Sequence, residues 1–277
     1  VADNMMYKAK KSGKNCIALP SEGEMAEMFK KASDKVLMII SALEENRIIP
    51  YFQPIIDTAS GEAVIHELLM RLQVGDRIVA ANEFIEEAEA MGLAHKMDYQ
   101  LIEKAFAQIN EQGYRGMLFV NLSPKALIVG EFMNRIHKLV IDYAIEPSRI
   151  VFEITERETV SNLTLLEKFV ADLKFRGFSF AIDDFGSGYS SFHYIKRFPV
   201  DYIKVEGEFI RNMLTDSEYR AFAKSIVTLA KELHIKTVAE YVENEPILDE
   251  VRQFGIDYAQ GYHIGRPAPL LITGKNP

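Results

Sequence analysis

Two adjacent carboxylates, Asp183 and Asp184, follow an apolar segment that begins at Phe178. The segment is short, and small or polar residues alternate with apolar ones along it, as is typical of a buried strand. Gly186 and Gly188 then turn the chain into a new segment. Adjacent acids at the end of a buried strand stay ionised only beside a cation or strong hydrogen-bond donors. The pair therefore indicates a cation site, although a lone Asp-Asp pair would also suit a helix N-cap and a flexible turn.

Four other apolar segments carry a polar side chain near the carboxyl end of a predicted strand. These side chains are Asn121 in MLFVNLS, Glu153 and Glu156 in RIVFEITE, Lys204 and Glu206 in DYIKVE, and Glu240 in KTVAEYVE. Any one of them alone would be an ordinary strand end that meets solvent or pairs with a neighbour. A parallel barrel gathers the carboxyl ends of its strands on one rim, where active sites lie. Five such strands therefore predict one shared site.

The segment IHELLMR (65–71) adds two charged residues, because Glu67 and Arg71 share one face of a predicted strand with Leu69. Two interpretations are open. The commoner arrangement is a structural ion pair, and the functional one is a metal ligand beside a guanidinium that binds phosphate.

The predicted rim carries more carboxylates than cations. Its polar residues are Glu67, Glu153, Glu156, Asp183, Asp184, Glu240, Asn121 and Lys204. Two carboxylates about 4 Å apart repel by roughly 4 kcal/mol at an effective dielectric constant of 20. Oxygen ligands without cysteine or histidine favour Mg²⁺ or Mn²⁺ over zinc, and two such ions can clamp a phosphodiester for attack by water. Lys204 would then orient that water or stabilise charge on the phosphate.

Strands and helices alternate from Tyr51 to the carboxyl end, which predicts the elements that position this rim. Strands are expected over 51–57, 61–72, 117–122, 149–155, 178–183, 201–205, 236–241 and 256–260. Helices are expected over 82–91, 95–112, 125–144, 162–176, 190–197, 216–233 and 245–254. Repeated strand–helix units predict an α/β fold with a parallel sheet, and their number favours a closed barrel. The opening strand pair spoils the eightfold repeat, so we expect a modified TIM (β/α)8 barrel.

The composition limits the class of protein and its location. Of 277 residues, 48% are hydrophobic, which is enough for a full core. The 32 Lys and Arg against 40 Asp and Glu give a formal charge of −8, which disfavours binding of polymeric nucleic acid. Cys16 is the only cysteine, so no internal disulfide forms. No apolar run is long enough to span a bilayer and no signal peptide is visible, so we expect a cytoplasmic protein.

The first 47 residues are expected to precede the main domain. Residues 2–19, ADNMMYKAKKSGKNCIAL, resemble the last helix and strand of a GGDEF diguanylate cyclase domain, with an ordinary amphipathic helix as the competing interpretation. The signature loop of that family is absent. We therefore divide the chain into a GGDEF-like remnant at 1–20, a connecting helix at 21–47 and the main domain at 48–277. This division implies a longer protein, with GGDEF and sensory domains before this chain.

Seven motifs, HELLMR, VNLSP, FEITE, AIDDFGSGYSS, DYIKVE, VAEYVE and AQGY, resemble in this order those of EAL-domain cyclic di-GMP phosphodiesterases. The match runs from about Tyr51 to Pro269. The resemblance implies a modified TIM barrel with one reversed strand. It also implies metal-dependent hydrolysis of cyclic di-GMP to linear pGpG, with two Mg²⁺ or Mn²⁺ ions. The alternative is a catalytically silent cyclic di-GMP receptor, because fold alone does not separate the two.

The resemblance further implies roles for individual residues. One metal ion would be held by Glu67, Asn121, Glu153 and Asp183, and the second by Asp183 and Asp184. The attacking water would be surrounded by Lys204 and Glu240, with Gln260 nearby, while Glu156 would brace the loop after Asp184. The dinucleotide would be contacted by Gln53 and Arg71.

Three positions depart from the family pattern. Leu68 stands where Ala is usual, Glu206 where Asp is usual, and Tyr241 where Gly is usual. None is a metal ligand in the family, so these departures bear on rate and pocket shape. The resemblance also implies a homodimer through the segment after Asp184, with Phe192 and Tyr194 as apolar residues left for a partner.

Overall fold

The computed structural model describes residues 21–123, 130–161, 163–187, 195, 197, 199–272 and 274–275. Its strands are β1 (Ile48–Asp57), β2 (Glu62–Val74), β3 (Arg77–Ala80), β4 (Met117–Asn121), β5 (Ile150–Thr155), β6 (Ser179–Phe185), β7 (Tyr202–Val205), β8 (Lys236–Ala239), β9 (Tyr258–Gln260) and β10 (Gly274–Lys275). Its helices are α2 (Glu22–Glu44), α3 (Ile85–Ala90), α4 (Ala94–Glu111), α6 (Gly130–Asp142), α7 (Glu156–Ser161), α8 (Leu163–Phe175), α9 (Gly207–Asn212), α10 (Ser217–Glu232) and α11 (Glu245–Phe254). Short 3-10 turns are η1 (Ala81–Glu83) and η2 (Pro147–Arg149).

Eight strands of the described chain close into a barrel, in the order β1, β9, β8, β7, β6, β5, β4, β2 and back to β1. Neighbouring strands run parallel all the way from β2, through β4, β5, β6, β7 and β8, to β9. β1 runs antiparallel to both of its neighbours, β2 and β9. The expected α/β fold, a modified TIM barrel with one reversed strand, is therefore confirmed. β3 and β10 extend the sheet by pairing antiparallel with β2.

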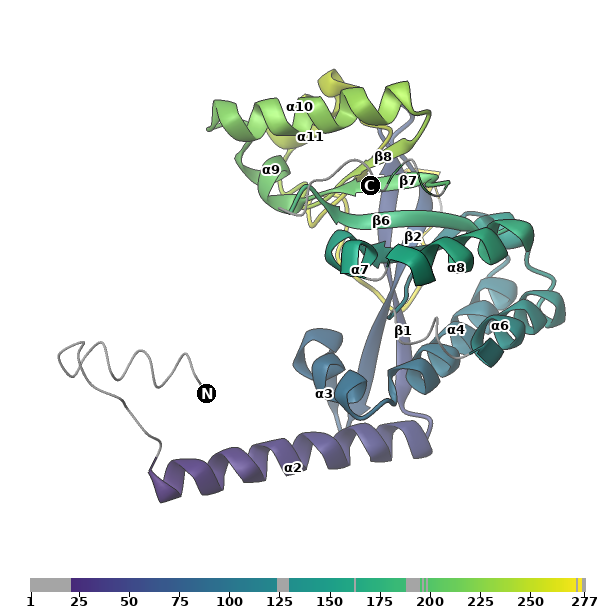
Figure 1. Ribbon diagram of the computed structural model, residues 1–277, viewed down its shortest axis with the longest axis vertical. Helices are drawn as coiled ribbons and strands as arrows, with labels where there is room; N and C mark the ends of the chain where they lie inside the picture. The colour runs from purple at the N-terminus through teal and green to yellow at the C-terminus, as the bar shows by residue number, and fades with distance from the viewer. Residues whose placement is uncertain are drawn as a thin grey trace.

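The helices lie outside the ring of strands, with α10 and α11 at one end of the molecule and α2 at the other (Figure 1). α2 occupies most of the connecting segment expected at 21–47 and packs against α3 and β2. It begins at a capping box, in which the Ser21 and Glu24 side chains each accept from the other residue's backbone N–H. None of the helices in the described ranges combines the length and the apolar character that a membrane span requires.

The core has two parts. The larger part fills the space between the strands and the surrounding helices, and it includes Phe106, Phe152 and Phe180. The smaller part, here called the inner cluster, contains side chains from seven strands that fill the barrel interior: Ile55, Ile65, Phe119, Val151, Ala181, Tyr202 and Val238. Each strand contributes one residue to it, as the inward layers of a small barrel require.

The structure changes several predicted boundaries. The helix expected over 162–176 is preceded by a separate helix, α7, and α9 was not predicted. The strand expected over 236–241 ends at Ala239, because Tyr241 has φ 53° and leaves the extended conformation. Of the helix expected over 125–144, residues 130–142 are helical, and residues 124–129 lie outside the described part. Residues 1–20, Phe192, Tyr194 and most of 190–197 also lie outside it.

Candidate active site

The predicted site residues form the next layer of the barrel, directly above the inner cluster. Residues two apart on a strand point to the same side, so the residue two positions after each inner-cluster residue also points inward. On the parallel strands those residues are Glu67, Asn121, Glu153, Asp183, Lys204 and Glu240. On the reversed strand β1 the equivalent is Gln53, two residues before Ile55. The closed topology thus brings together residues that are far apart in the sequence.

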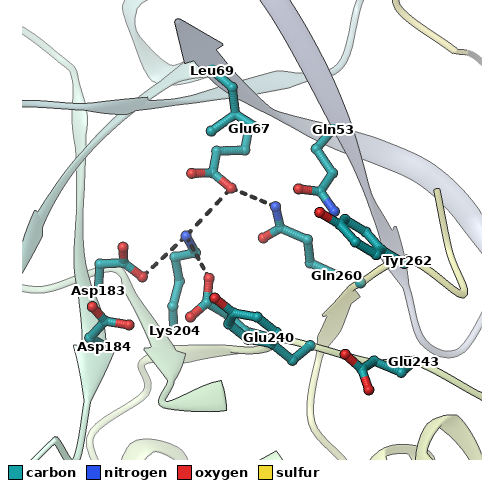
Figure 2. A pocket seen from close by; sticks show the side chains of 12 residues that line it. Gln53, Glu67, Leu69, Asp183, Asp184, Lys204, Glu240, Glu243, Gln260 and Tyr262 are labelled. Carbon is teal, nitrogen blue, oxygen red and sulfur yellow. Dashed lines mark hydrogen bonds and ion pairs between the residues drawn. The ribbon is translucent and has the colours of Figure 1, made fainter. Parts of the chain in front are cut away.

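Lys204 lies at the centre of this polar layer and is 1% exposed (Figure 2). Its Nζ lies 2.9 Å from Glu240 Oε1, 3.1 Å from Asp183 Oδ1, 3.3 Å from Glu153 Oε2 and 3.7 Å from Glu67 Oε2. Burial alone would lower the pKa of this lysine, but the four carboxylates outweigh it and raise the pKa above its usual range. Lys204 is therefore a fixed cation.

Glu67 is well satisfied by its neighbours. Its Oε1 accepts a hydrogen bond from Asn121 Nδ2 at 2.8 Å, and its Oε2 accepts one from Gln260 Nε2 at 2.5 Å. Burial would raise the pKa of Glu67, but the charge of Lys204 and these hydrogen bonds lower it overall. Glu67 is consequently ionised at neutral pH, with its carboxylate held in one orientation.

Glu153 and Asp183, unlike Glu67, have buried carboxylate oxygens that accept no hydrogen bond from the described residues. Both carboxylate oxygens of Glu153 and Oδ1 of Asp183 are buried without a hydrogen-bond partner in the described structure, although Glu153 Oε2 and Asp183 Oδ1 form ion pairs with Lys204. Burial raises the pKa of Glu153 well above its usual range; Lys204 counters this, and the nearby Glu67, Asp183 and Glu240 add to it. Burial likewise raises the pKa of Glu240 to about 8, against the effect of Lys204. One ammonium group does not compensate four carboxylates.

Asp184 faces the same site as Asp183, although adjacent residues on a strand normally point to opposite sides. The register between β6 and β7 shifts between Ile182 and Phe185, and Asp184 has φ 52°, so the strand is distorted at the aspartate pair. One oxygen each from Asp183, Asp184 and Glu240 lie within 4.8 Å of one another. Burial and the charge of Asp183 raise the pKa of Asp184 to about 6.

This set of donors fits a hard divalent cation. All donors are carboxylate or amide oxygens, which suit Mg²⁺ or Mn²⁺. The buried Glu153 and Asp183 oxygens that accept no hydrogen bond within the described part of the chain supply lone pairs that a cation would satisfy. The excess negative charge favours binding of a cation for the same reason.

Glu156 and Arg71 lie around this centre in different ways. Glu156 is fully buried, and its Oε2 accepts a hydrogen bond from the backbone N–H of Gly186 at 2.8 Å, just after the aspartate pair. Arg71 does not pair with Glu67 in the described structure; its Nη1 donates to the Met70 carbonyl at 2.8 Å and its guanidinium lies over the Tyr51 ring. The structural ion pair considered for Glu67 and Arg71 is therefore wrong.

A cavity of about 360 Å³ opens above the polar layer. Its lining residues are Gln53, Glu67, Leu69, Asp183, Asp184, Lys204, Glu240, Tyr241, Glu243, Gln260, Gly261 and Tyr262. Gln53 and Tyr262 lie on the opposite side of the cavity from Asp183 and Asp184 (Figure 2). Gln53 also donates to the Gly265 carbonyl at 3.1 Å. Arg71 does not line the cavity.

Sequence reasoning missed Glu243 and Tyr262 as lining residues. Both follow strand ends, but neither lies on an alternating strand pattern that would mark it as inward-facing. The available signal was that Glu243 and Tyr262 are the last residues of the motifs VAEYVE and AQGY.

Comparison with known proteins agrees with this geometry. A family model described as the EAL domain matches residues 38–267. Cyclic di-GMP phosphodiesterase PdeB of Shewanella oneidensis is 36% identical over 275 residues, which are 97% of this chain and 32% of that protein. The chain spans about a third of the length of this relative and of two other curated relatives that it matches.

Two solved structures share the fold and were determined with a ligand. The PaMucR phosphodiesterase in complex with c-di-GMP superimposes with a TM-score of 0.80 at 27% identity, covering 85% of this chain and 98% of that one. The FimX EAL domain of Pseudomonas aeruginosa bound to c-di-GMP gives a TM-score of 0.81 at 26% identity, covering 88% and 100%. With the family match over most of its length, the chain belongs to the EAL domain family.

Proposed function

We propose that this chain hydrolyses one phosphodiester bond of cyclic di-GMP to give linear pGpG, using two Mg²⁺ or Mn²⁺ ions. The observation that carries the proposal is the polar layer of the barrel, in which four carboxylates surround one lysine. Such a layer destabilises the free protein and suits chemistry that needs cations and a charged substrate. The relatives named as cyclic di-GMP phosphodiesterases support the choice of substrate.

Two groups of oxygen donors would hold the ions. We assign Glu67, Asn121, Glu153 and Asp183 to one ion, and Asp183 with Asp184 to the other. When bound, the ions supply Lewis acidity toward the phosphate and lower the pKa of water. Gln260 keeps Glu67 in its orientation through the 2.5 Å hydrogen bond, and Glu156 fixes the backbone after the aspartates through Gly186.

Lys204 and Glu240 would act on the reacting groups. Lys204 is buried and charged, so it stabilises negative charge that develops on the phosphate oxygens. Glu240 lies 2.9 Å from Lys204 and lines the cavity, where its ionised form, which bound cations would favour, can accept a proton from the attacking water. Gln53, which also lines the cavity, would contact the dinucleotide, and Arg71 would reach it only by leaving the Met70 carbonyl.

A second candidate function is binding of cyclic di-GMP without hydrolysis. It is favoured by the FimX EAL domain, a neighbour with the same fold that was solved with c-di-GMP bound. A receptor has no need for catalytic side chains, whereas this chain has a carboxylate, amide or lysine at each matching position of the polar layer. This completeness supports the enzyme.

Assembly and location extend the proposal. We propose a homodimer through the segment after Asp184, which analytical ultracentrifugation tests directly: a monomer at all concentrations would refute it. The preceding GGDEF and sensory domains and the cytoplasmic location are also predictions from the sequence.

The deciding experiment incubates the chain with cyclic di-GMP and Mn²⁺ and separates the products by chromatography. We expect pGpG, loss of its formation in a chelator, and recovery with Mg²⁺ or Mn²⁺. Ca²⁺ should occupy the site without supporting turnover, because its looser coordination misplaces water and phosphate. Tight binding with no pGpG would favour the receptor.

Glu67→Gln is the matched variant for this experiment. The substitution preserves the side-chain volume while removing the charge, so we expect loss of turnover with much of the nucleotide binding retained. A variant that hydrolyses cyclic di-GMP as fast as the wild type would refute the ligand assignment. Repeating the assay on a longer chain with the preceding domain tests whether an inactive result reflects a missing activating segment.

A further inference from the structure

Tyr241, which directly follows Glu240, is held in an unusual backbone conformation. Its φ of 53° lies in the left-handed region, which costs roughly 1 kcal/mol for a residue with a Cβ and nothing for glycine. The side chain is 49% exposed and lines the cavity above the polar layer. A large ring at a strained position beside a catalytic carboxylate calls for an explanation in terms of what it contacts.

The ring is positioned from one side by α9. A Cβ added at Gly207, the first residue of α9, would lie 2.0 Å from Tyr241 Cδ2, so only glycine lets the ring approach the helix this closely. One turn further along α9, the Arg211 guanidinium carbon lies 4.5 Å from the centre of the Tyr241 ring. Gly207 and Arg211 therefore hold the ring from the protein side, and its exposed area borders the cavity.

The environment of this ring suits a flat, uncharged group better than a second charge. Asp184, Glu206 and Glu240 lie close enough to Tyr241 to raise the pKa of its hydroxyl, with burial as the larger cause, so the tyrosine is neutral. Arg211 offsets part of this negative charge. A nucleic acid base placed on the ring gains stacking without bringing another anion to the site.

We infer that Tyr241, backed by Arg211 and given room by Gly207, is a stacking platform for one purine base of the dinucleotide. The inference rests on the proposed function and deepens it, because it identifies a residue that sets substrate affinity. A base seated on the residue after Glu240 would fix its attached phosphodiester near Glu240 and Lys204. Tyr262 does not serve this position, because its ring lies on the opposite side of the cavity from Asp183 and Asp184 (Figure 2).

Tyr241→Gly tests the platform without endangering the fold. Glycine accepts φ 53° freely, so the variant should unfold at a temperature equal to or above that of the wild type. Loss of base stacking is expected to raise the KM for cyclic di-GMP by about tenfold, with a smaller effect on kcat. Tyr241→Phe keeps the ring and should restore most of the affinity. Phe175→Ala, which removes an aromatic ring that is 91% exposed on α8, is the matched control and should leave KM unchanged.

Gly207→Ala provides an independent variant, which keeps the Tyr241 ring but places a methyl group in the space that the ring occupies beside α9. The added Cβ displaces Tyr241 toward the cavity, so KM should again rise. A purely structural role for Tyr241 predicts the reverse result for Tyr241→Gly, namely a lower unfolding temperature with wild-type KM, and this result would overturn the platform.

The two proposals fail in different ways. If the wild-type chain forms pGpG and Tyr241→Gly has the same KM, the platform is wrong and the proposed function stands. If the wild-type chain neither binds nor hydrolyses cyclic di-GMP, the proposed function fails and the platform with it. A raised KM in both Tyr241→Gly and Gly207→Ala, with restoration in Tyr241→Phe, supports the platform.

Discussion

Two adjacent layers of the same barrel differ completely in chemistry. The inner cluster contains seven buried, mostly aliphatic or aromatic side chains, such as Phe119 and Val151. Two residues further along the same strands, facing the same interior, lie Asn121 and Glu153 with the rest of the polar layer. Both layers belong to the same strands, so the difference between them lies in their side chains.

The difference shows which layer stabilises the protein and which one costs stability. Burying an apolar side chain of this size contributes about 1.5–3 kcal/mol. A buried carboxylate without sufficient compensation costs several kcal/mol, and Glu153 is fully buried, accepts no hydrogen bond in the described structure and shares the Lys204 charge with three other carboxylates. The inner cluster therefore supports a layer whose cost in stability the proposed cations and substrate would offset.

Asp183→Asn should give the largest effect, and it acts on the polar layer alone. Asparagine keeps the volume but removes the charge that we assign to both ions, so we expect turnover to fall by at least about 10³-fold. The assay is pGpG formation with saturating Mn²⁺, alongside thermal unfolding to show that the variant is folded. Activity within about tenfold of the wild type would show that Asp183 does not bridge the two ions.

Phe119→Ala acts on the layer below and should have the opposite character. Phe119 is fully buried and packs edge-to-face on Tyr202, with ring centroids 5.1 Å apart. Truncation leaves a cavity and should lower the free energy of unfolding by about 3–5 kcal/mol, measured in urea. A loss below about 1 kcal/mol would mean that the inner cluster is not what holds the barrel together.

Most of the fold was predictable from the sequence because its signal is local. Apolar strands with period two alternate with helical segments, and this pattern alone predicted a closed barrel. The polar layer was predictable for a related reason, since Glu153, Asp183, Lys204 and Glu240 interrupt otherwise apolar strands near their ends. Gln53 and Gln260 followed only from the family resemblance, because a glutamine at a strand end is unremarkable.

What could not be predicted depends on tertiary contacts. The chain after β9 reaches the cavity because Gly261 packs against the Val242 backbone, where an added Cβ would lie 2.1 Å from the carbonyl oxygen. No local pattern encodes that contact, so Tyr262 was missed. Strand periodicity placed Arg71 on the same face as Glu67, but it does not determine the course of the long Arg71 side chain, which bends back to the Met70 carbonyl.

Glu153→Gln sharpens the comparison by making the polar layer less charged. In the metal-free protein it removes a carboxylate whose pKa burial raises well above the usual range, so we expect stability to increase by about 1–3 kcal/mol. The same variant should lose most of the rise in unfolding temperature that Mn²⁺ produces in the wild type. Differential scanning fluorimetry with and without Mn²⁺ measures both effects. A variant that is less stable than the wild type without metal would contradict the cost that we assign to this layer.

Asp98→Asn tests whether an uncompensated carboxyl group outside the site affects stability in the same way as the carboxyl groups within it. Asp98 is buried on α4, and burial, with a smaller contribution from Glu89, raises its pKa to about 8. A raised pKa means that the folded state binds the proton more tightly than the unfolded state, whose pKa is near 3.8. The stability that Asp98 contributes is therefore fully present below pH 3.8 and is lost as the pH rises through about 8.

Asparagine stays neutral over this whole pH range, so the stability of the variant should not fall in this way as the pH rises. We expect Asp98→Asn to be more stable than the wild type by about 1–2 kcal/mol at pH 8 and to differ little at pH 4, in urea unfolding at both pH values. Asp98 lies outside the polar layer, so the gain should be the same with and without Mn²⁺, unlike that of Glu153→Gln. A gain that disappears in Mn²⁺ would connect Asp98 to the metal site and break the separation between the site and the rest of the barrel.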